Sequence, residues 1–339
     1  MKFPATIVLV LSCLLTLAGC SWQGAAPEAK EPATDETSAR NELASRAGAP
    51  LFDDMGSHHH PITTNDPDAQ RYFDQCLELA EEHGLGRIIA ANLSLRSYVS
   101  CWQNDIDSAI AGYREAIHLA VQIKDPRAQM MALMIGGSFW SLVGDAVEGE
   151  KWLRSSMKII RRIGAGLFEG VCVYLLGRFA LLRGDRVQAR TLTQRGIAIL
   201  QQSESGMTFG GPIALGILAL AAEDEEQCHA ALLEAETILS AGSVGHNYLN
   251  FYEDAMEACL QFEAWEAVER YALALQDYTR PEPLPRSDYF IARGRALAAF
   301  GRGRRDENTL QTLQQLCSEA DKNGFKLSRH AIDAALEAG

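Results

Sequence analysis

The chain has 339 residues, of which 47% are hydrophobic, and 44 acidic residues outnumber 31 lysines and arginines, giving a formal net charge of −13. This apolar content excludes a wholly disordered chain. The acidic excess leaves no obvious source of positive charge for neutralising phosphates, so we expect no nucleic-acid partner.

The first element is a signal segment. Lys2 precedes an apolar run over residues 7–17, which is shorter than the roughly 20 residues of a membrane-spanning helix. The run ends on Leu17-Ala18-Gly19-Cys20, which resembles a bacterial lipobox. An ordinary signal peptide followed by a chance cysteine is the alternative.

The lipobox resemblance implies that residues 1–19 are removed and that Cys20 carries acyl chains such as palmitate. The protein would then attach to the bacterial cell envelope through lipid alone, since no other segment could span a bilayer. Ser21 stands where an inner-membrane retention signal would have Asp, so the expected location is the outer membrane, with a periplasmic domain.

Residues 20–57 form the lipidated cysteine and a tether rich in Ala, Pro, Glu, Thr and Ser, with no helical or strand period. A flexible coil of this length reaches roughly 35 Å. Residues 58–67 form a lead-in loop with His58, His59 and His60. Adjacent imidazoles rarely fill one coordination shell, so we expect a solvated loop and no metal, with metal binding as the weaker alternative.

From residue 68 to residue 339, apolar residues recur at three-and-four spacing, separated by short Gly, Asp or Pro punctuation. This pattern predicts fourteen helices and no strand. The expected ranges are 68–82, 85–102, 105–123, 126–142, 145–163, 167–183, 186–202, 209–221, 224–240, 246–261, 264–278, 287–300, 304–322 and 327–337.

The turns between these helices keep a constant step of 39 or 40 residues. They are Asn104-Asp105, Gly144-Asp145, Gly184-Asp185, Glu223-Asp224, Glu263-Ala264 and Gly303-Arg304. Such a fixed period predicts an all-α solenoid of about six helical hairpins with capping helices. Where the turn is a Gly-Asp pair, we expect the Gly to end one helix and the Asp to cap the next.

Small residues occupy matching places in the repeat, where they let paired helices approach closely. They are Ser97, Gly137, Gly177, Gly216 and Gly294 before the turn, and Ala109, Gly149, Ala189 and Cys228 after it. This spacing resembles the tetratricopeptide repeat, most closely at Asn104-Asp105, Ala109, Tyr113 and Ala116. The resemblance implies a right-handed superhelix, although the period of about 40 exceeds the usual 34 residues.

A second resemblance covers residues 206–303 and concerns the C-terminal repeat region of multidomain class III adenylyl cyclases that carry an ATPase module. It rests on Gly206-Met207, Gly211-Pro212, Val244-Gly245-His246-Asn247, Phe251-Tyr252, Asp277-Tyr278-Thr279-Arg280 and Phe290-Ile291-Ala292-Arg293-Gly294-Arg295. Neither the cyclase nor the ATPase part is present, so the resemblance implies no catalytic activity.

The first helix of each hairpin lines the concave side in tetratricopeptide repeats. Counting from the small residue of each unit, the resemblance gives as groove candidates Tyr98, Trp102, Met131, Met134, Ser138, Tyr174, Arg178, Asn250, Glu253, Glu257, Asp288 and Arg295. The early half is aromatic and Met-rich, which suits an apolar or helical segment of a protein or peptide partner. Burial between helices is the alternative for each of these side chains.

Specific enzyme motifs are absent from the sequence: there is no phosphate-binding G-x-x-x-x-G-K-[ST], H-E-x-x-H, G-x-S-x-G or C-x-x-C. His246 and Asn247 have no identifiable nucleophile near them, so we expect them to cap a helix start. We therefore predict a protein with no catalytic residues and no cofactor, acting as a membrane-anchored scaffold for protein interactions. The alternative is a periplasmic receptor for a small molecule or metal.

Cysteines outside the signal are scattered singly at apolar helical positions. Cys228 and Cys259 lie at similar distances before and after the turn near Ser243, so antiparallel helices would place them level. We expect free thiols that act as small hydrophobes. A disulfide between Cys228 and Cys259, in an oxidising compartment, is the weaker alternative.

Overall fold

The structure is a computed structural model that describes residues 67–338. This part of the chain forms fourteen α-helices and contains no strand, which confirms the predicted fold class. The helices are α3 (Pro67–Glu82), α4 (Gly86–Trp102), α5 (Ile106–Gln122), α6 (Pro126–Val143), α7 (Ala146–Ile163), α8 (Gly166–Leu182), α9 (Arg186–Leu200), α10 (Gly206–Leu220), α11 (Glu225–Ala241), α12 (Gly245–Gln261), α13 (Trp265–Thr279), α14 (Pro285–Gly301), α15 (Glu307–Asn323) and α16 (Lys326–Ala338).

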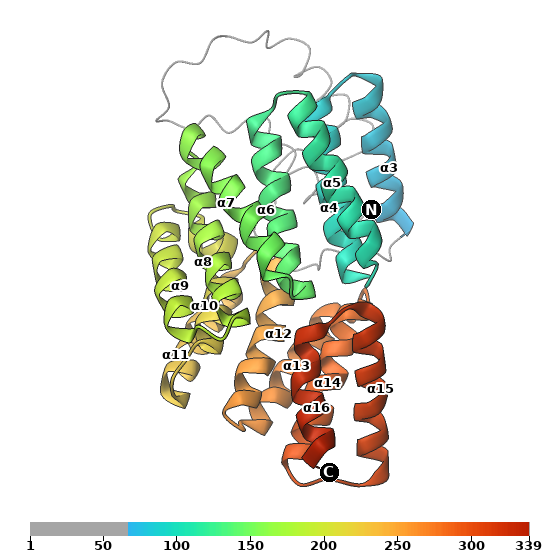
Figure 1. The fold of residues 1–339 in the computed structure, drawn as a ribbon, viewed down its shortest axis with the longest axis vertical. Helices are drawn as coiled ribbons and strands as arrows, with labels where there is room; N and C mark the ends of the chain where they lie inside the picture. Colours follow the sequence, from blue (N-terminus) through green and yellow to red (C-terminus); the bar gives the residue numbers. More distant parts are fainter. Residues whose placement is uncertain (1–66, 339) are drawn as a thin grey trace.

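Each helix packs on its neighbours in the chain, as expected for a solenoid. The number of hairpins is larger than the six predicted, because the end helices α3 and α16 pack on α4 and α15 as further pairs. Figure 1 shows the array curving from α3 through α8 and α10 to α14. The curvature is strong enough to bring α14 into contact with α4.

The turns explain the period of the sequence. Gly144 and Gly184 have φ values of 80° and 79°, and the equivalent turn residues Asn104, Glu263 and Gly303 also have positive φ. This left-handed conformation ends a helix, and glycine adopts it at the least cost. A second series of positive φ values, at Gly84, Lys124, Gly164 and Gly324, marks turns between hairpins. One helix and its turn therefore take about 20 residues over most of the array.

Aspartates begin several of the helices, as predicted. The side chains of Asp105, Asp145 and Asp185 accept hydrogen bonds from the backbone N–H three residues later, at 3.1, 3.0 and 2.9 Å. Such caps satisfy donors that have no partner within the helix. Ala264 is the N-cap residue of α13 and has no side chain that can accept a hydrogen bond. The fifth turn therefore keeps the spacing of the repeat without a side-chain cap.

Small residues bring the helices of a hairpin together. A Cβ atom added at Gly177 would lie 2.4 Å from Thr193 Oγ1 and 3.0 Å from the carbonyl oxygen of Ala189. α8 and α9 consequently pack backbone against side chain, a closeness that a larger residue at Gly177 would prevent.

The even-numbered helices form the inner layer of the array. α8 has ten buried residues among seventeen, whereas its hairpin partner α9 has five among fifteen. A helix that is apolar on most sides is expected in a buried layer, and one with a polar face at the surface. The inner helices therefore determine what the concave side presents. No helix within residues 67–338 is long and apolar enough to cross a membrane.

Candidate binding cavity

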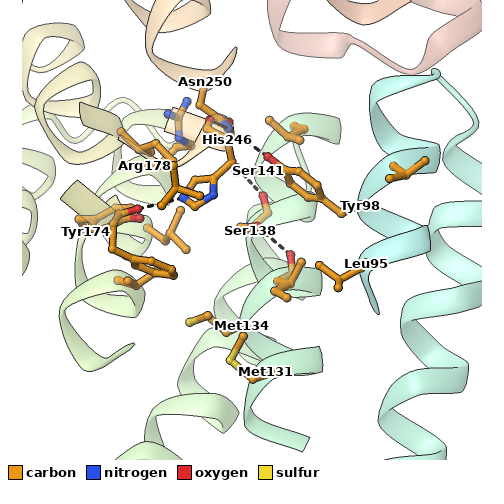
Figure 2. A pocket seen from close by; sticks show the side chains of 18 of the residues that line it. Leu95, Tyr98, Met131, Met134, Ser138, Ser141, Tyr174, Arg178, His246 and Asn250 are labelled. Atoms are coloured by element: carbon orange, nitrogen blue, oxygen red, sulfur yellow. Dashed lines mark hydrogen bonds between the residues drawn. The ribbon is translucent and has the colours of Figure 1, made fainter. Parts of the chain in front are cut away.

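The inner helices enclose a cavity of about 140 Å³. Seven of the twelve predicted groove residues line it, and they come from four different helices. They are Tyr98, Met131, Met134, Ser138, Tyr174, Arg178 and Asn250. Figure 2 shows these side chains around one space, together with Leu95, Ser141 and His246. The positions counted from the repeat thus converge on a cavity, while their contact with a ligand stays a prediction.

The walls of the cavity are mainly apolar. Met131 and Met134 are 9% and 4% exposed on α6, and Val171 of α8 and Ile213 of α10 belong to the same apolar lining. Methionine side chains adapt to irregular shapes, so this wall can follow the outline of an apolar group.

The other predicted groove residues lie outside the cavity. Trp102 is buried beneath Arg286, whose guanidinium carbon is 5.4 Å from the ring centroid. Glu253 and Glu257 make ion pairs with Arg286 and Arg293 of α14.

Asp288 is exposed, and Arg295 donates hydrogen bonds to Glu269 and Gln276 of α13. Both positions are counted from Gly294, which does not hold the place that the small residue has in the other units. Counting back seven from the turn at Gly303 gives Ala296, not Gly294. A shift of two residues turns a helical position by about 200°.

Pro212 lies inside α10 and frees a backbone carbonyl in the preceding turn. Proline has no N–H to donate to the carbonyl oxygen four residues earlier, which here is that of Thr208. This oxygen accepts hydrogen bonds from Ser243 Oγ at 2.7 Å and from Asn247 Nδ2 at 3.1 Å. Two segments of the cyclase-like resemblance, Gly211-Pro212 and Val244 to Asn247, are thereby joined.

The expectation that His246 and Asn247 cap their own helix is wrong. α12 begins after Val244 without a side-chain cap, and both side chains bind α10 instead. The carbonyl oxygen of Phe209 accepts from His246 Nε2 at 2.9 Å and from Asn247 Nδ2 at 3.0 Å. These bonds place His246 and Asn250 beside the cavity.

His246 is neutral at ordinary pH. A carbonyl oxygen only accepts, so the bond to Phe209 fixes the proton on Nε2 and leaves Nδ1 as an acceptor. Burial lowers the pKa of His246 to about 4, against the opposing effect of that hydrogen bond. The imidazole therefore brings no positive charge to the cavity.

Arg178 lines the cavity, and its positive charge is paired with Asp254. Its two terminal nitrogens donate to the two carboxylate oxygens of Asp254, with Nη1 to Oδ1 at 2.8 Å. The pair joins α8 to α12, and it passes α10 at Gly216, where an added Cβ would lie 2.9 Å from Asp254 Oδ2. The missing side chain at Gly216 thus gives Asp254 room to reach Arg178.

Two contacts close the array across its concave side. Asn250 Nδ2 of α12 donates to Tyr98 Oη of α4 at 3.3 Å, across 152 residues of sequence. Arg286 of α14 stacks on Trp102 of α4 and also lies 4.8 Å from the Phe290 ring centroid. These contacts bridge the concave side, from α4 to α12 and from α4 to α14.

A buried ion-pair cluster connects α12 to α14. Arg286 Nη2 donates to Glu253 Oε2 at 3.1 Å, and both side chains are less than 10% exposed. Burial raises the pKa of Glu253 to about 7, although the charge of Arg286 acts in the opposite direction. Arg293 pairs with Glu257 and donates from Nε to the carbonyl oxygen of Ser328 at 2.7 Å, which extends the cluster to α16.

The six cysteines that the structure describes are free thiols. Cys228 and Cys259 are both buried and lie close enough to influence each other electrostatically. Burial raises the pKa of Cys228 to about 11 and that of Cys259 to about 12, which disfavours the thiolate that disulfide exchange requires. The proposed disulfide is thus not formed in this structure.

Several predicted features lie outside the described residues: the signal segment 1–19, lipidation at Cys20, the tether to residue 57, and His58, His59 and His60. Within residues 67–338, no group of three or more His, Cys, Asp or Glu side chains is arranged to hold a metal ion.

Some residues that line the cavity are not among the groove positions predicted from the repeat. Phe209, Ile213 and His246 line the cavity although the repeat count did not select them. Pro212 was a usable signal, because a proline inside a helical segment predicts free carbonyls that a nearby polar segment can bind.

Comparison with known proteins adds no assignment. No protein-family model matches the chain, and no curated protein shows significant sequence similarity to it.

Proposed function

We propose that this protein is a non-catalytic binding protein that holds a small, mainly apolar ligand on the concave side of its helical array. The observation that carries this proposal is the convergence of seven repeat-derived positions on one apolar cavity with a few polar groups. Such a cavity is the usual form of a small-molecule site.

Four polar side chains of the cavity already have a structural task, which favours binding without chemistry. Ser138 Oγ donates to the carbonyl oxygen of Ile135 at 2.7 Å, and Ser141 Oγ donates to that of Ser138 at 2.6 Å. Arg178 is paired with Asp254, and His246 holds Phe209. A nucleophile and base poised together would need side chains free to react.

Blocking the cavity tests this function. Ile135 lines the cavity and is partly exposed, so Ile135→Phe adds bulk there at moderate risk to folding. Val187 is 65% exposed on α9, and Val187→Phe adds more bulk outside the cavity. Small-molecule fragments that bind the full chain by ligand-observed NMR should be lost in Ile135→Phe and kept in Val187→Phe. Equal binding to both variants would refute a site in the cavity.

A second candidate is a protein partner that inserts one apolar side chain into the same cavity. The pair Met131 and Met134, next to Tyr98, favours it, since Met-rich surfaces accommodate varied apolar anchors. Crosslinking in intact envelopes distinguishes this candidate. A partner captured by the parent chain should be lost with Ile135→Phe and kept with Val187→Phe.

The proposal also covers the cellular location and the family relationship of the protein, and both rest on the sequence. We propose attachment to the bacterial cell envelope, at the outer membrane, through acylated Cys20. The cell should incorporate labelled palmitate into the protein, and Cys20→Ser should abolish the label. The 40-residue spacing of the turns supports a tetratricopeptide-like repeat, and residues 206–303 support kinship with the cyclase-associated repeat region.

A further inference from the structure

The cavity is partly open and has room for about one ring. A volume of about 140 Å³ is close to that of apolar protein cavities of about 150 Å³ that take up benzene. Met131 and Met134 lie on one helix and Ile213 on another, and all three line the cavity. A flat or compact apolar body of six to ten heavy atoms fits this order of volume.

The charge of the cavity limits the ligand to a neutral molecule. Arg178 is the charged residue that lines the cavity, and Asp254 compensates it through two hydrogen bonds. His246 carries its proton on Nε2 and none on Nδ1. A charged ligand would lose its hydration here without gaining a counter-ion, at a cost that an uncharged molecule avoids.

The hydroxyls of two tyrosines determine which polar group on a ligand the cavity can bind. Within residues 67–338, the hydroxyl of Tyr174 makes no hydrogen bond, and the residue is 2% exposed. The hydroxyl oxygen of Tyr98 accepts from Asn250, which leaves its own proton to be donated. Burial raises the pKa of both hydroxyls, so both keep their protons. A donor without a partner in the wall of a cavity favours a ligand that brings an acceptor.

We propose that the cavity binds an uncharged molecule of about one six-membered ring that carries a carbonyl or hydroxyl oxygen, and that Tyr174 donates a hydrogen bond to this oxygen. This inference rests on the proposed function and adds the chemical class of the ligand. His246 Nδ1 provides the matching acceptor for a hydroxyl. Figure 2 shows Tyr174 and His246 on the same side of the cavity.

The experiment uses four probes of similar size: acetophenone, ethylbenzene, benzoate and benzylamine. Binding to the full chain carrying Cys20→Ser is measured by calorimetry without detergent, since detergent would compete for an apolar cavity. We expect acetophenone to bind more tightly than ethylbenzene, and the two charged probes not to bind measurably.

Tyr174→Phe removes the proposed donor while preserving the ring. It should weaken acetophenone binding about three- to tenfold, the range of one net hydrogen bond, and leave ethylbenzene binding unchanged. Tyr113→Phe is the matched control, because Tyr113 is a fully buried tyrosine that does not line the cavity. It should leave the affinities for both probes unchanged.

The outcomes separate this inference from the function on which it rests. If ethylbenzene or a charged probe binds as tightly as acetophenone, and Ile135→Phe abolishes that binding, the cavity is a binding site but the proposed ligand class is wrong. Equal loss of both neutral probes in Tyr174→Phe would also overturn the role of its hydroxyl. If no probe binds the folded full chain, the ligand class and the small-molecule function both fail.

Discussion

Asp254 on α12 reaches past α10 to form two hydrogen bonds with Arg178 on α8, and these two residues are 76 positions apart in sequence. The pair neutralises the charged residue of the cavity wall and connects two inner helices that are not neighbours in the chain. The same pair therefore fixes the positions of α8 and α12 on the concave side and leaves Arg178 without excess charge there.

Breaking this pair should be costly. Arg178 and Asp254 have side chains only 14% and 8% exposed, so Arg178→Met leaves a buried carboxylate without its partner. We expect a loss of about 3–5 kcal/mol in the free energy of unfolding, measured by urea denaturation. Arg302→Met removes the exposed pair with Glu266 and should cost less than about 1 kcal/mol. Similar losses in the two variants would contradict the role given to the buried pair.

Gly216 should tolerate no side chain. Gly216→Ala would place a Cβ 2.9 Å from Asp254 Oδ2 and 3.0 Å from Asp254 Cβ, so α10 and α12 must separate. The expected cost is about 1–3 kcal/mol in the free energy of unfolding. Gly166→Ala is the control, because no atom lies within 4 Å of its added Cβ, and it should be neutral or slightly stabilising. A neutral Gly216→Ala would show that Asp254 does not need this space.

Asn247 should matter more than its neighbour Ser243. Its fully buried amide donates to the carbonyl oxygens of Thr208 and Phe209 and to Ser243 Oγ. Asn247→Ala withdraws these bonds from two carbonyls, of which Pro212 frees that of Thr208, and we expect a loss of about 2–3 kcal/mol in thermal or urea unfolding. Ser243→Ala removes the bond that Ser243 Oγ donates to Thr208 and the one it accepts from Asn247, but it leaves the bonds of Asn247 to both carbonyls. It should therefore cost less, about 1 kcal/mol. The reverse order would contradict the proposed attachment of α12 to α10.

His246 should make the fold sensitive to acid. Its pKa is about 4 in the folded chain, below the ordinary 6.5, because burial disfavours the imidazolium. The unfolded chain binds the proton more readily, so stability falls as the pH drops from about 6.5 to about 4. His246→Gln should lose less stability than the parent over this window in thermal melts. Parallel pH profiles for the two proteins would refute a buried, neutral His246.

Glu253 should act in the opposite direction. Burial raises its pKa from 4.5 to about 7, so the folded chain holds the proton more tightly than the unfolded chain. Its contribution to stability is complete below about pH 4.5 and is lost as the pH rises to about 7. The melting temperature of the parent relative to Glu253→Gln should therefore decline over this window. A relative melting temperature that is constant or rises with pH would show that Arg286 keeps Glu253 ionised.

The repeat itself could be predicted from sequence because it depends on local chemistry. Left-handed turn residues such as Gly144 and Gly184, and caps such as Asp145, act within a few residues of their own position. The same count selects positions on the inner helices, of which Met134 and Tyr174 line the cavity.

The contacts across the concave side could not be predicted, because they depend on residues far apart in the sequence. The contact between Tyr98 and Asn250 results from curvature accumulated over 152 residues, which no local pattern reports. In the last unit Gly294 resembled the reference small residue, although Ala296 holds that position relative to the turn at Gly303. Arg293 consequently reaches Glu257 from the inner layer, where Arg295 had been expected.

A crystal structure of the full chain with acetophenone tests the central claim most directly. We predict the ligand between Met134 and Ile213, with its oxygen about 2.7 Å from the Tyr174 hydroxyl and with Tyr98 still in contact with Asn250. A structure in which α4 is separated from α12 and the inner layer forms an open groove without the ligand would contradict the account.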